Sequence, residues 1–138
     1  MLYDIIHGNI SLCETAKNII DTIEFQRLRE IKQLGCCYLV FPCAVHTRFE
    51  HSIGVYHLAK QYIDILNVDG KYFTERERLC ISIAGLIHDI GHGPYSHLFD
   101  DIVPKEKHHE YRSGIILKRM NTKYNLGFSE EEVNFIID

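Results

Sequence analysis

The sequence predicts an all-α, mostly helical domain with at most a small β ribbon near the N-terminal third. Two observations favour this class. Four capping boxes each precede a segment with apolar residues at helical spacing, and the strand-like stretches are short. The length of 138 residues suits one domain, and 46% apolar with 25% charged residues is typical of a folded globular protein.

The first 35 residues are expected to hold two helices. A short helix is expected over residues 14–20. The capping box at residues 21–24, with Asp21 as the N-cap, would open a second helix that stops at Gly35. The apolar face of this second helix would contain Phe25, Leu28 and Ile31.

Two short stretches have the composition of strands, residues 9–12 and residues 38–41, and the second runs up to Pro42. They could form the small ribbon.

Three further capping boxes begin at Thr47, Thr74 and Ser129. Each leads into a segment with an apolar face. These faces contain Val55, Ala59, Tyr62, Ile63 and Leu66, then Leu79, Ile83, Leu86 and Ile87, and finally Val133, Ile136 and Ile137. Loops are expected at residues 67–71, 103–107 and 121–127. The last helix reaches Asp138 without a stop signal, so the domain is expected to be cut short there.

Charge and composition narrow the classes of partner. The net charge of −4 gives no sign of a bulk polyanion binder, although nucleic acid is not excluded and a phosphate-bearing substrate needs only local positive charge. The sequence shows no signal peptide and no apolar run that could span a bilayer, so we expect no membrane partner and a cytoplasmic or nuclear location. The five cysteines lack a C-x-x-C pair, which predicts reduced, mostly buried thiols in a reducing compartment.

Histidine is the outlier of the composition, because five of the nine lie between His88 and His109. His88 and Asp89 end an apolar helix, with His92 close behind, and His51 lies in the first turns of another helix. Imidazole nitrogens and carboxylate oxygens are ligands for divalent metals. Any one of these residues alone is more often structural. Burying them together without a charge partner is costly, and a bound cation would offset that cost.

Arg48 precedes His51 by three residues, so both side chains can face one pocket. A guanidinium matches phosphate oxygens with its fixed fork of donors. A metal, an arginine and several free histidines together suit hydrolysis of a phosphoester.

The order His51 … His88-Asp89 resembles the first three metal ligands of the HD-domain metal phosphohydrolases. Longer strings are more specific, namely FQRLRxIKQLG at residues 25–35, RFEHSxGV at 48–55 and HDxGHGPxSH at 88–97. Together they resemble the deoxynucleoside triphosphate (dNTP) triphosphohydrolases of the SAM-and-HD-domain type. The similarity extends from Asp4 to about Ile137.

The resemblance implies a helical HD domain that hydrolyses dNTPs to deoxynucleoside and inorganic triphosphate. It implies one divalent ion of iron, zinc or manganese, with magnesium accompanying the nucleotide. The implied ligands of the ion are His51, His88 and Asp89. Arg48 would contact the α-phosphate, while Gln33 and its neighbour Leu34 would contact the substrate, Gln33 at the deoxyribose. The implied active-site histidines are His92, His97 and His109. His97 is the candidate acid for the leaving 5′-oxygen, with Asp100 orienting its ring.

The family also has an activating guanine nucleotide site between subunits, which makes a homo-oligomer an expectation. Asp21, Gln26 and Arg29 match positions that read the guanine base. Val40 and Phe41 match apolar residues of a neighbouring allosteric pocket. From the residues alone, Asp21 is an N-cap, and the other two polar side chains could belong to an exposed helix face.

The fourth metal ligand of the family, an aspartate, has no counterpart in these 138 residues. We therefore expect one HD domain over residues 1–138, truncated at its C-terminal side and weak or inactive by itself. The alternative is a non-catalytic HD-domain remnant that binds nucleotide, nucleic acid or a full-length homologue.

Overall fold

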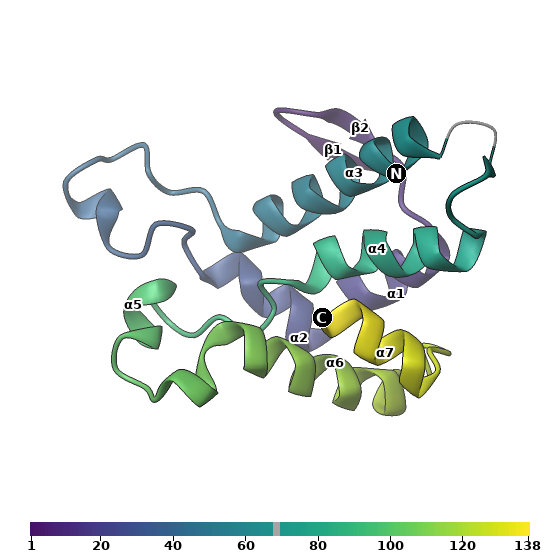
Figure 1. Cartoon of the computed structure of the whole chain (residues 1–138). Helices are drawn as coiled ribbons and strands as arrows, with labels where there is room; N and C mark the ends of the chain where they lie inside the picture. Colours follow the sequence, from purple (N-terminus) through teal and green to yellow (C-terminus); the bar gives the residue numbers. More distant parts are fainter. Residues whose placement is uncertain (68–69) are drawn as a thin grey trace.

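The computed structural model describes residues 1–67 and 70–138, which form a helical domain with one two-stranded ribbon (Figure 1). The ribbon consists of β1 (Leu2–Asp4) and β2 (Gly8–Ile10). The α-helices are α1 (Glu14–Ile20), α2 (Ile23–Gln26), α3 (Arg48–Leu66), α4 (Glu75–Ile87), α5 (His97–Asp100), α6 (His109–Tyr124) and α7 (Glu130–Ile137). Short 3-10 helices are η1 (Arg27–Glu30), η2 (Cys37–Leu39) and η4 (Lys105–Lys107). The predicted fold class is confirmed.

The core lies where α3 and α4 pack along each other and where α7 packs against both α4 and α6 (Figure 1). Ile53 of α3, Leu86 of α4 and Leu117 of α6 are almost completely buried. Leu28 of η1 joins the same cluster from the N-terminal part. Each such side chain contributes roughly 2 kcal/mol through the water-exposed area it loses. This packing fixes the start of α3 beside the end of α4.

The observed ribbon shares one strand with the expected ribbon, but the partner of that strand is different. β2 overlaps the predicted stretch 9–12, but its antiparallel partner is β1, with Leu2 opposite Ile10. The predicted strand at residues 38–41 is wrong: η2 and a turn occupy it, and the amide of Phe41 donates to the carbonyl of Cys37. In the described part of the chain no strand lies beside residues 38–41 to pair with them, so local hydrogen bonds satisfy the backbone of this stretch. Val40 and Phe41 are left exposed.

The predicted capping boxes at Thr47, Thr74 and Ser129 are confirmed. The capping box predicted at residues 21–24 is wrong, because the N-cap lies one residue later and its third following residue, Phe25, has no polar side chain to close a box. Thr22 caps α2 by accepting from the amide of Phe25, and Asp21 is instead the C-cap of α1. In the turn between α1 and α2, the Thr22 hydroxyl also donates to the carbonyl of Ile19, and this bond holds Thr22 at the N-cap position.

The prediction that this helix continues to Gly35 is also wrong. The α-helical part ends at Gln26, and η1 ends where Ile31 becomes extended. The next residue, Lys32, forms an isolated antiparallel bridge with Thr47. This tertiary pairing at the entry to α3 prevails over local helix propensity.

Some apolar faces and loops also depart from the sequence pattern. Tyr62 and Leu66 were assigned to the apolar face of α3, but both are exposed, whereas Ile53 and Tyr56 face the core. The loop predicted at residues 121–127 starts later than expected, because α6 continues to Tyr124. The loop expected at 67–71 includes residues 68 and 69, which lie outside the described residues.

All five cysteines are free thiols, but the expectation that most are buried is wrong. Only Cys80 is buried, while Cys37 and Cys43 are exposed. None of the helices over residues 1–67 and 70–138 combines the length and the hydropathy that a transmembrane span requires.

The start of α7 is attached to α4 by Arg76, which donates to both carboxylate oxygens of Glu132 and to the carbonyl of Gly127. The bond from Arg76, helped by the amide of Ser129, lowers the pKa of Glu132 to about 2. A carboxylate with a lowered pKa stabilises the fold above its unfolded pKa, and this stabilisation is lost as the pH falls through the folded value.

We expect Glu132→Gln to lower the free energy of unfolding by about 1 kcal/mol at about pH 6, a figure reduced for solvent screening. The difference from the parent chain should shrink steadily between about pH 4.5 and pH 2, as urea unfolding at each pH would measure. Glu131→Gln, at an exposed position of the same turn, is the matched control. A difference that is constant with pH would contradict this account.

Candidate metal centre

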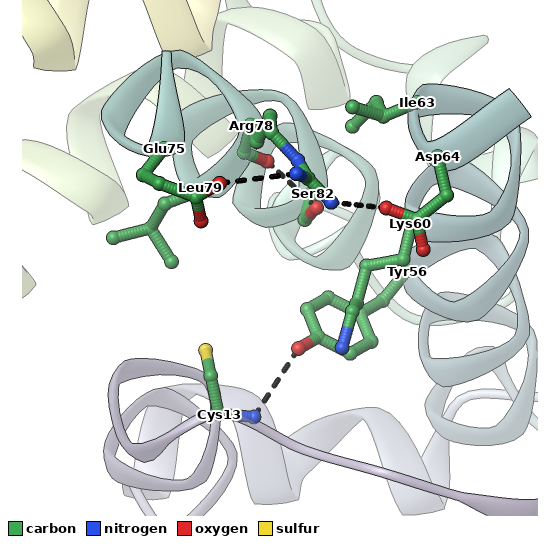
Figure 2. Close-up of a pocket in the computed structure, with 9 residues that line it drawn as sticks. All are labelled: Cys13, Tyr56, Lys60, Ile63, Asp64, Glu75, Arg78, Leu79 and Ser82. Atoms are coloured by element: carbon green, nitrogen blue, oxygen red, sulfur yellow. Dashed lines mark hydrogen bonds and ion pairs between the residues drawn. The ribbon is translucent and has the colours of Figure 1, made fainter. Parts of the chain in front are cut away.

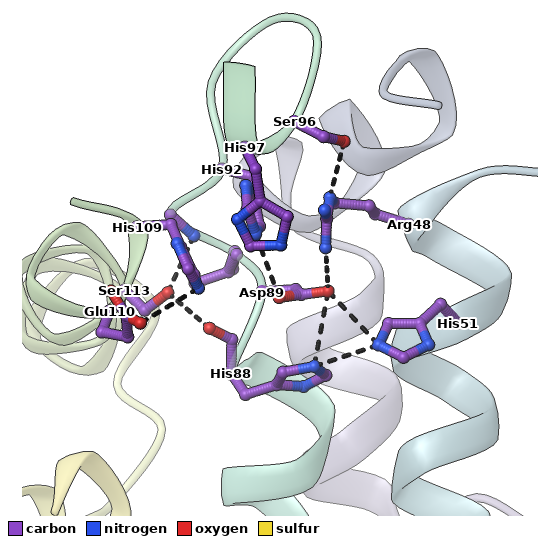
Figure 3. A network of polar contacts seen from close by, with 12 residues as sticks. Arg48, His51, His88, Asp89, His92, Ser96, His97, His109, Glu110 and Ser113 are labelled. Carbon is purple, nitrogen blue, oxygen red and sulfur yellow. Dashed lines mark hydrogen bonds and ion pairs between the residues drawn. The ribbon is translucent and has the colours of Figure 1, made fainter. Parts of the chain in front are cut away.

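Two helices bring three potential metal ligands together (Figure 3). His51 lies in the first turns of α3, and His88 and Asp89 directly follow the last residue of α4. The Nε2 atoms of His51 and His88 are 3.1 Å apart. The Oδ2 atom of Asp89 lies 3.3 Å from the first and 3.4 Å from the second. We call these three residues the triad. The sequence predicted that they would meet, and they do.

The triad has the dimensions of a metal site. Ligands bonded to an ion at about 2.1 Å are about 3.0 Å apart at octahedral angles and about 3.4 Å apart at tetrahedral angles. The three distances in the triad lie within these limits. The Nδ1 of His88 is 2.8 Å from the carbonyl of Gly85 and can donate to it, which leaves the Nε2 lone pair facing the triad. The donor set therefore fits one divalent ion.

Arg48 is buried against the triad. Its Nη1 donates to Asp89 Oδ2 at 2.5 Å and its Nε donates to the hydroxyl of Ser96 at 2.9 Å. Ser96 in turn donates to the carbonyl of Lys32, and it has a left-handed backbone with φ of 60°. A non-glycine residue in that region is strained, so the surrounding contacts must hold it. The contacts with Asp89 and with Ser96 thus fix the orientation of the Arg48 guanidinium.

Burial and charge act in opposite directions on the ionisable groups here. Burial alone would raise the pKa of Asp89, but His88, His92 and the charge of Arg48 hold it well below its usual value. Burial lowers the pKa of His51 and of His92, which favours their neutral forms. Burial opposes the charged form of His88 as well, but the neighbouring Asp89 raises its pKa overall. The ionised carboxylate of Asp89 and the neutral form of His51 are the states that bind a metal, whereas a protonated His88 would have to release its proton when an ion binds.

The loop after α4 is held by two arginines from distant parts of the chain. Arg27 donates to the carbonyls of Ile90 and His92, both at 2.6 Å, and Arg112 donates to the carbonyl of Gly91 at 2.7 Å. Ser113 accepts from the amide of Gly91 and donates to the carbonyl of His88. The carbonyls of this loop, which lie outside the helix, therefore have hydrogen-bond partners. These contacts fix the backbone that presents His88 and Asp89.

Arg27→Met should lower the free energy of unfolding by about 2 kcal/mol, because two carbonyls lose charged hydrogen bonds while the apolar stem is kept. We also expect roughly tenfold weaker metal binding, since the backbone behind the ligands loosens. Urea unfolding and a metal titration would measure both. The control is Arg119→Met at an exposed position of α6. Equal effects of the two substitutions would contradict a positioning role for Arg27.

The remaining predicted active-site histidines gather beside the triad, but Asp100 serves a different ring than expected. Asp100 Oδ2 lies 2.7 Å from Nδ1 of His109 and 3.7 Å from Nδ1 of His97, so the hydrogen bond is made to His109. The ring of His92 is completely buried and stacks on that of His109 at 3.9 Å between centroids. His97 is largely exposed. The four residues form one cluster.

The other predicted contacts are spread more widely. The buried side-chain oxygen of Gln33 has no hydrogen-bond partner among residues 1–67 and 70–138, while the Gln33 carbonyl accepts from Arg48. The neighbouring Leu34 is half exposed. Gln26 donates to the carbonyl of Ile20 and accepts from Arg29. The guanidinium of Arg29 lies over the ring of Phe49.

The residues expected around an activating nucleotide lie in two separate parts of the chain. Asp21 lies at the junction of α1 and α2, next to the Gln26–Arg29 pair. Val40 and Phe41 lie in the segment between η1 and α3, which projects away from the helices (Figure 1).

Two cavities flank the helices. One of about 250 Å³ lies between the start of α1, the second half of α3 and the first half of α4 (Figure 2). There the hydroxyl of Tyr56 accepts from the amide of Cys13, and none of the predicted site residues lines it. The other, of about 350 Å³, is lined by residues of α3, α4, α6 and α7, with His88, Glu110, Ser113 and Asp138 as its polar members. Only the second adjoins the triad.

Sequence reasoning did not identify several residues that build the site. Ser96 lies within the HDxGHGPxSH string, so a signal for it was present. Arg27 lies within the FQRLRxIKQLG string, so a signal was present for it too. Arg112 and Ser113 lie outside the quoted strings, and no spacing along the chain indicates their contacts with the backbone of the loop after α4.

Known proteins similar to this chain share its site region. The HD domain family matches residues 48–137. The chain is 44% identical over 144 residues to the deoxynucleoside triphosphate triphosphohydrolase SAMHD1 homolog of Dictyostelium discoideum, an alignment with 99% of this chain and 28% of that protein. It is 53% identical over 102 residues to deoxynucleoside triphosphate triphosphohydrolase SAMHD1 of Homo sapiens, with 72% of this chain and 16% of that protein.

A viral protein is similar as well. Identity to an HD domain-containing protein of Acanthamoeba polyphaga mimivirus is 47% over 133 residues, with 80% of this chain and 28% of that protein. The chain thus spans less than a third of the length of these curated relatives. The family match covers more than half of the chain and contains all three residues of the triad. The chain belongs to the HD domain family.

Proposed function

We propose that this chain carries the metal-binding part of a phosphohydrolase that cleaves dNTPs to deoxynucleoside and inorganic triphosphate. The observation that carries the proposal is the triad with Arg48 buried against it. The substrate class is suggested by relatives named as dNTP triphosphohydrolases, which are 44% and 53% identical to this chain.

In this proposal the triad holds the divalent ion, which when bound supplies Lewis acidity toward phosphate oxygens. Arg48 offers further donors to the α-phosphate, since each of its terminal nitrogens makes only one of the two hydrogen bonds available to it. The unpartnered side-chain oxygen of Gln33 can accept from a deoxyribose hydroxyl. Leu34, next to it, would contact the sugar or base.

Proton transfer to the leaving 5′-oxygen is assigned to the histidines beside the triad. His97 is the most exposed of them and can reach an incoming nucleotide. His109 is held by Asp100, the pairing that fixes the tautomer and orientation of an imidazole. We propose that His97 is the acid. His109, held by Asp100, would fix the orientation of the buried His92 ring that stacks on it, and so keep the histidines in place.

We further propose that residues 1–138 hydrolyse dNTPs weakly by themselves. The described residues supply three ligands in the triad, and an ion with three protein ligands keeps open positions. A guanine nucleotide bound between subunits near Asp21, Gln26 and Arg29, with Val40 and Phe41 lining a neighbouring allosteric pocket, is the corresponding proposal for activation. The exposure of these two apolar side chains is compatible with an oligomer.

The test is release of inorganic triphosphate from dGTP by the purified chain with added Mn²⁺ or Fe²⁺. We expect slow release that requires the ion and is lost in His51→Gln. His57→Gln, also on α3 but outside the triad, is the control and should retain the rate. If no metal-dependent release occurs while dGTP still raises the thermal midpoint, the chain is a non-catalytic nucleotide-binding domain and the proposal is wrong.

A further inference from the structure

A second group of potential ligands lies outside the triad. One nitrogen each from His92, His97 and His109 and one carboxylate oxygen from Asp100 all lie within 4.8 Å of one another. They come from the loop after α4, from α5 and from the first residue of α6. Figure 3 shows the three imidazoles turned toward one another beside Asp89. We call these four residues the histidine cluster.

His92 is the least satisfied polar side chain of the cluster. It is completely buried, and its Nε2 lies 3.3 Å from Asp89 Oδ1, but neither ring nitrogen makes a hydrogen bond to any of the described residues. Buried polar atoms in folded proteins almost always have one, and an unsatisfied atom costs about 1–3 kcal/mol. Its Nδ1 lies 4.0 Å from Asp100 Oδ2, so a ligand at the centre of the cluster would satisfy it.

The distances approach those of a closed tetrahedral site. The Nδ1 atoms of His109, His97 and His92 lie 2.7, 3.7 and 4.0 Å from Asp100 Oδ2. Ligands of a tetrahedral ion are about 3.4 Å apart, so the rings need to move by less than about 1 Å relative to the carboxylate. The side chain of His97 is 69% exposed and lies on the short helix α5, so it can rotate inward.

The outer contacts also match those of a metal site. The Nε2 of His92 lies 3.3 Å from Asp89 Oδ1, and the Nε2 of His109 lies 3.4 Å from Glu110 Oε1. The second oxygen of Asp100 accepts from Arg112 at 2.8 Å. A carboxylate on the far nitrogen of each imidazole orients metal-ligating histidines in known sites. Binding would require His109 to carry its proton on Nε2 rather than Nδ1.

We propose that the histidine cluster is a second metal site, closed by four protein ligands and selective for Zn²⁺ or Co²⁺ over Mg²⁺. Three imidazoles and one carboxylate suit borderline ions that accept tetrahedral geometry. Binding there does not depend on the proposed hydrolysis. Only one consequence rests on that function: an ion in the cluster occupies the nitrogens of the acid and its partners, so excess Zn²⁺ would inhibit turnover.

The experiment is a Co²⁺ titration of the chain without nucleotide, read by bound ion per chain and by visible absorption. The parent chain should bind two ions, and the cluster ion should give the intense absorption of tetrahedral Co²⁺. His97→Gln should bind one ion and lose the part of the absorption that the cluster ion contributes. His51→Gln should lose the triad ion and keep the tetrahedral signal. His108→Gln, next to the cluster but outside it, should behave like the parent chain.

Because His97 is exposed, its replacement should leave the thermal midpoint unchanged without metal, so a loss of binding cannot be attributed to unfolding. One ion per chain in the parent would overturn the proposal. Two ions that persist in both His97→Gln and His109→Gln would overturn it as well. Loss of both ions in His51→Gln would show a single shared centre and would also exclude a separate site. None of these results bears on whether the chain hydrolyses dNTPs.

Discussion

Asp89→Ala is expected to abolish metal retention by the triad and to lower the free energy of unfolding by about 3–5 kcal/mol. The guanidinium of Arg48 is 2% exposed and donates to this carboxylate. Removing the carboxylate leaves a buried positive charge without its partner, and such a loss is far more destabilising than the loss of a surface ion pair. Metal analysis after dialysis and urea unfolding would measure the two effects.

Two further variants separate charge from packing. Asp101→Ala, at an exposed position after α5, should change neither metal content nor stability appreciably. The double variant Asp89→Ala with Arg48→Met removes both charges and should recover much of the stability, but it should still hold no ion in the triad. If the double variant is as unstable as Asp89→Ala alone, the unpaired charge is not the cause.

Gly91→Ala should lower the free energy of unfolding by about 2–3 kcal/mol and weaken metal binding at the same time. A Cβ at this position would overlap the carbonyl oxygen of His109 and the amide nitrogen of Ser113. Both are backbone atoms of α6 and cannot turn aside. The loop would therefore move away from α6, and it would take His88 and Asp89 with it.

Gly85→Ala is the matched control, because its Cβ would meet side-chain atoms of Val55 and Ala59 at 3.3 and 3.4 Å and the carbonyl oxygen of Val55 at 3.4 Å, all without overlap. The gain in helix propensity of about 1 kcal/mol should offset these tight contacts. Urea unfolding and Co²⁺ titration of both variants would test the comparison. Similar effects at positions 85 and 91 would show that the close approach of α6 to the loop is unimportant.

The helices and the triad were predictable because their signals are local. Capping boxes at Thr47, Thr74 and Ser129 depend on side chains three residues apart, and each formed as expected. The meeting of His51 with His88 and Asp89 was predicted from ligand chemistry and from the resemblance of the longer strings, and the geometry agrees.

The errors occurred where tertiary contacts decide the local structure. The stretch at 38–41 has strand composition, but the edge of the ribbon is taken by β1, which begins at the second residue of the chain. Asp100 follows His97 by three residues, yet its hydrogen bond goes to His109, nine residues away, because α6 begins against α5. Tyr62 and Leu66 have the spacing of a buried face, but no described helix covers them. Sequence spacing does not indicate which neighbour will be present.

Because Arg27 and Arg112 hold the loop after α4 from distant parts of the chain, the metal centre should form late in folding. Arg27 reaches carbonyls that lie 63 and 65 residues further along the chain, and His51 must meet a residue 37 positions away. Contacts of such sequence separation form only after the loops between them have closed. Ion uptake should therefore report completion of the native state rather than of any single helix, and micromolar metal in the refolding buffer should slow unfolding more than it speeds folding.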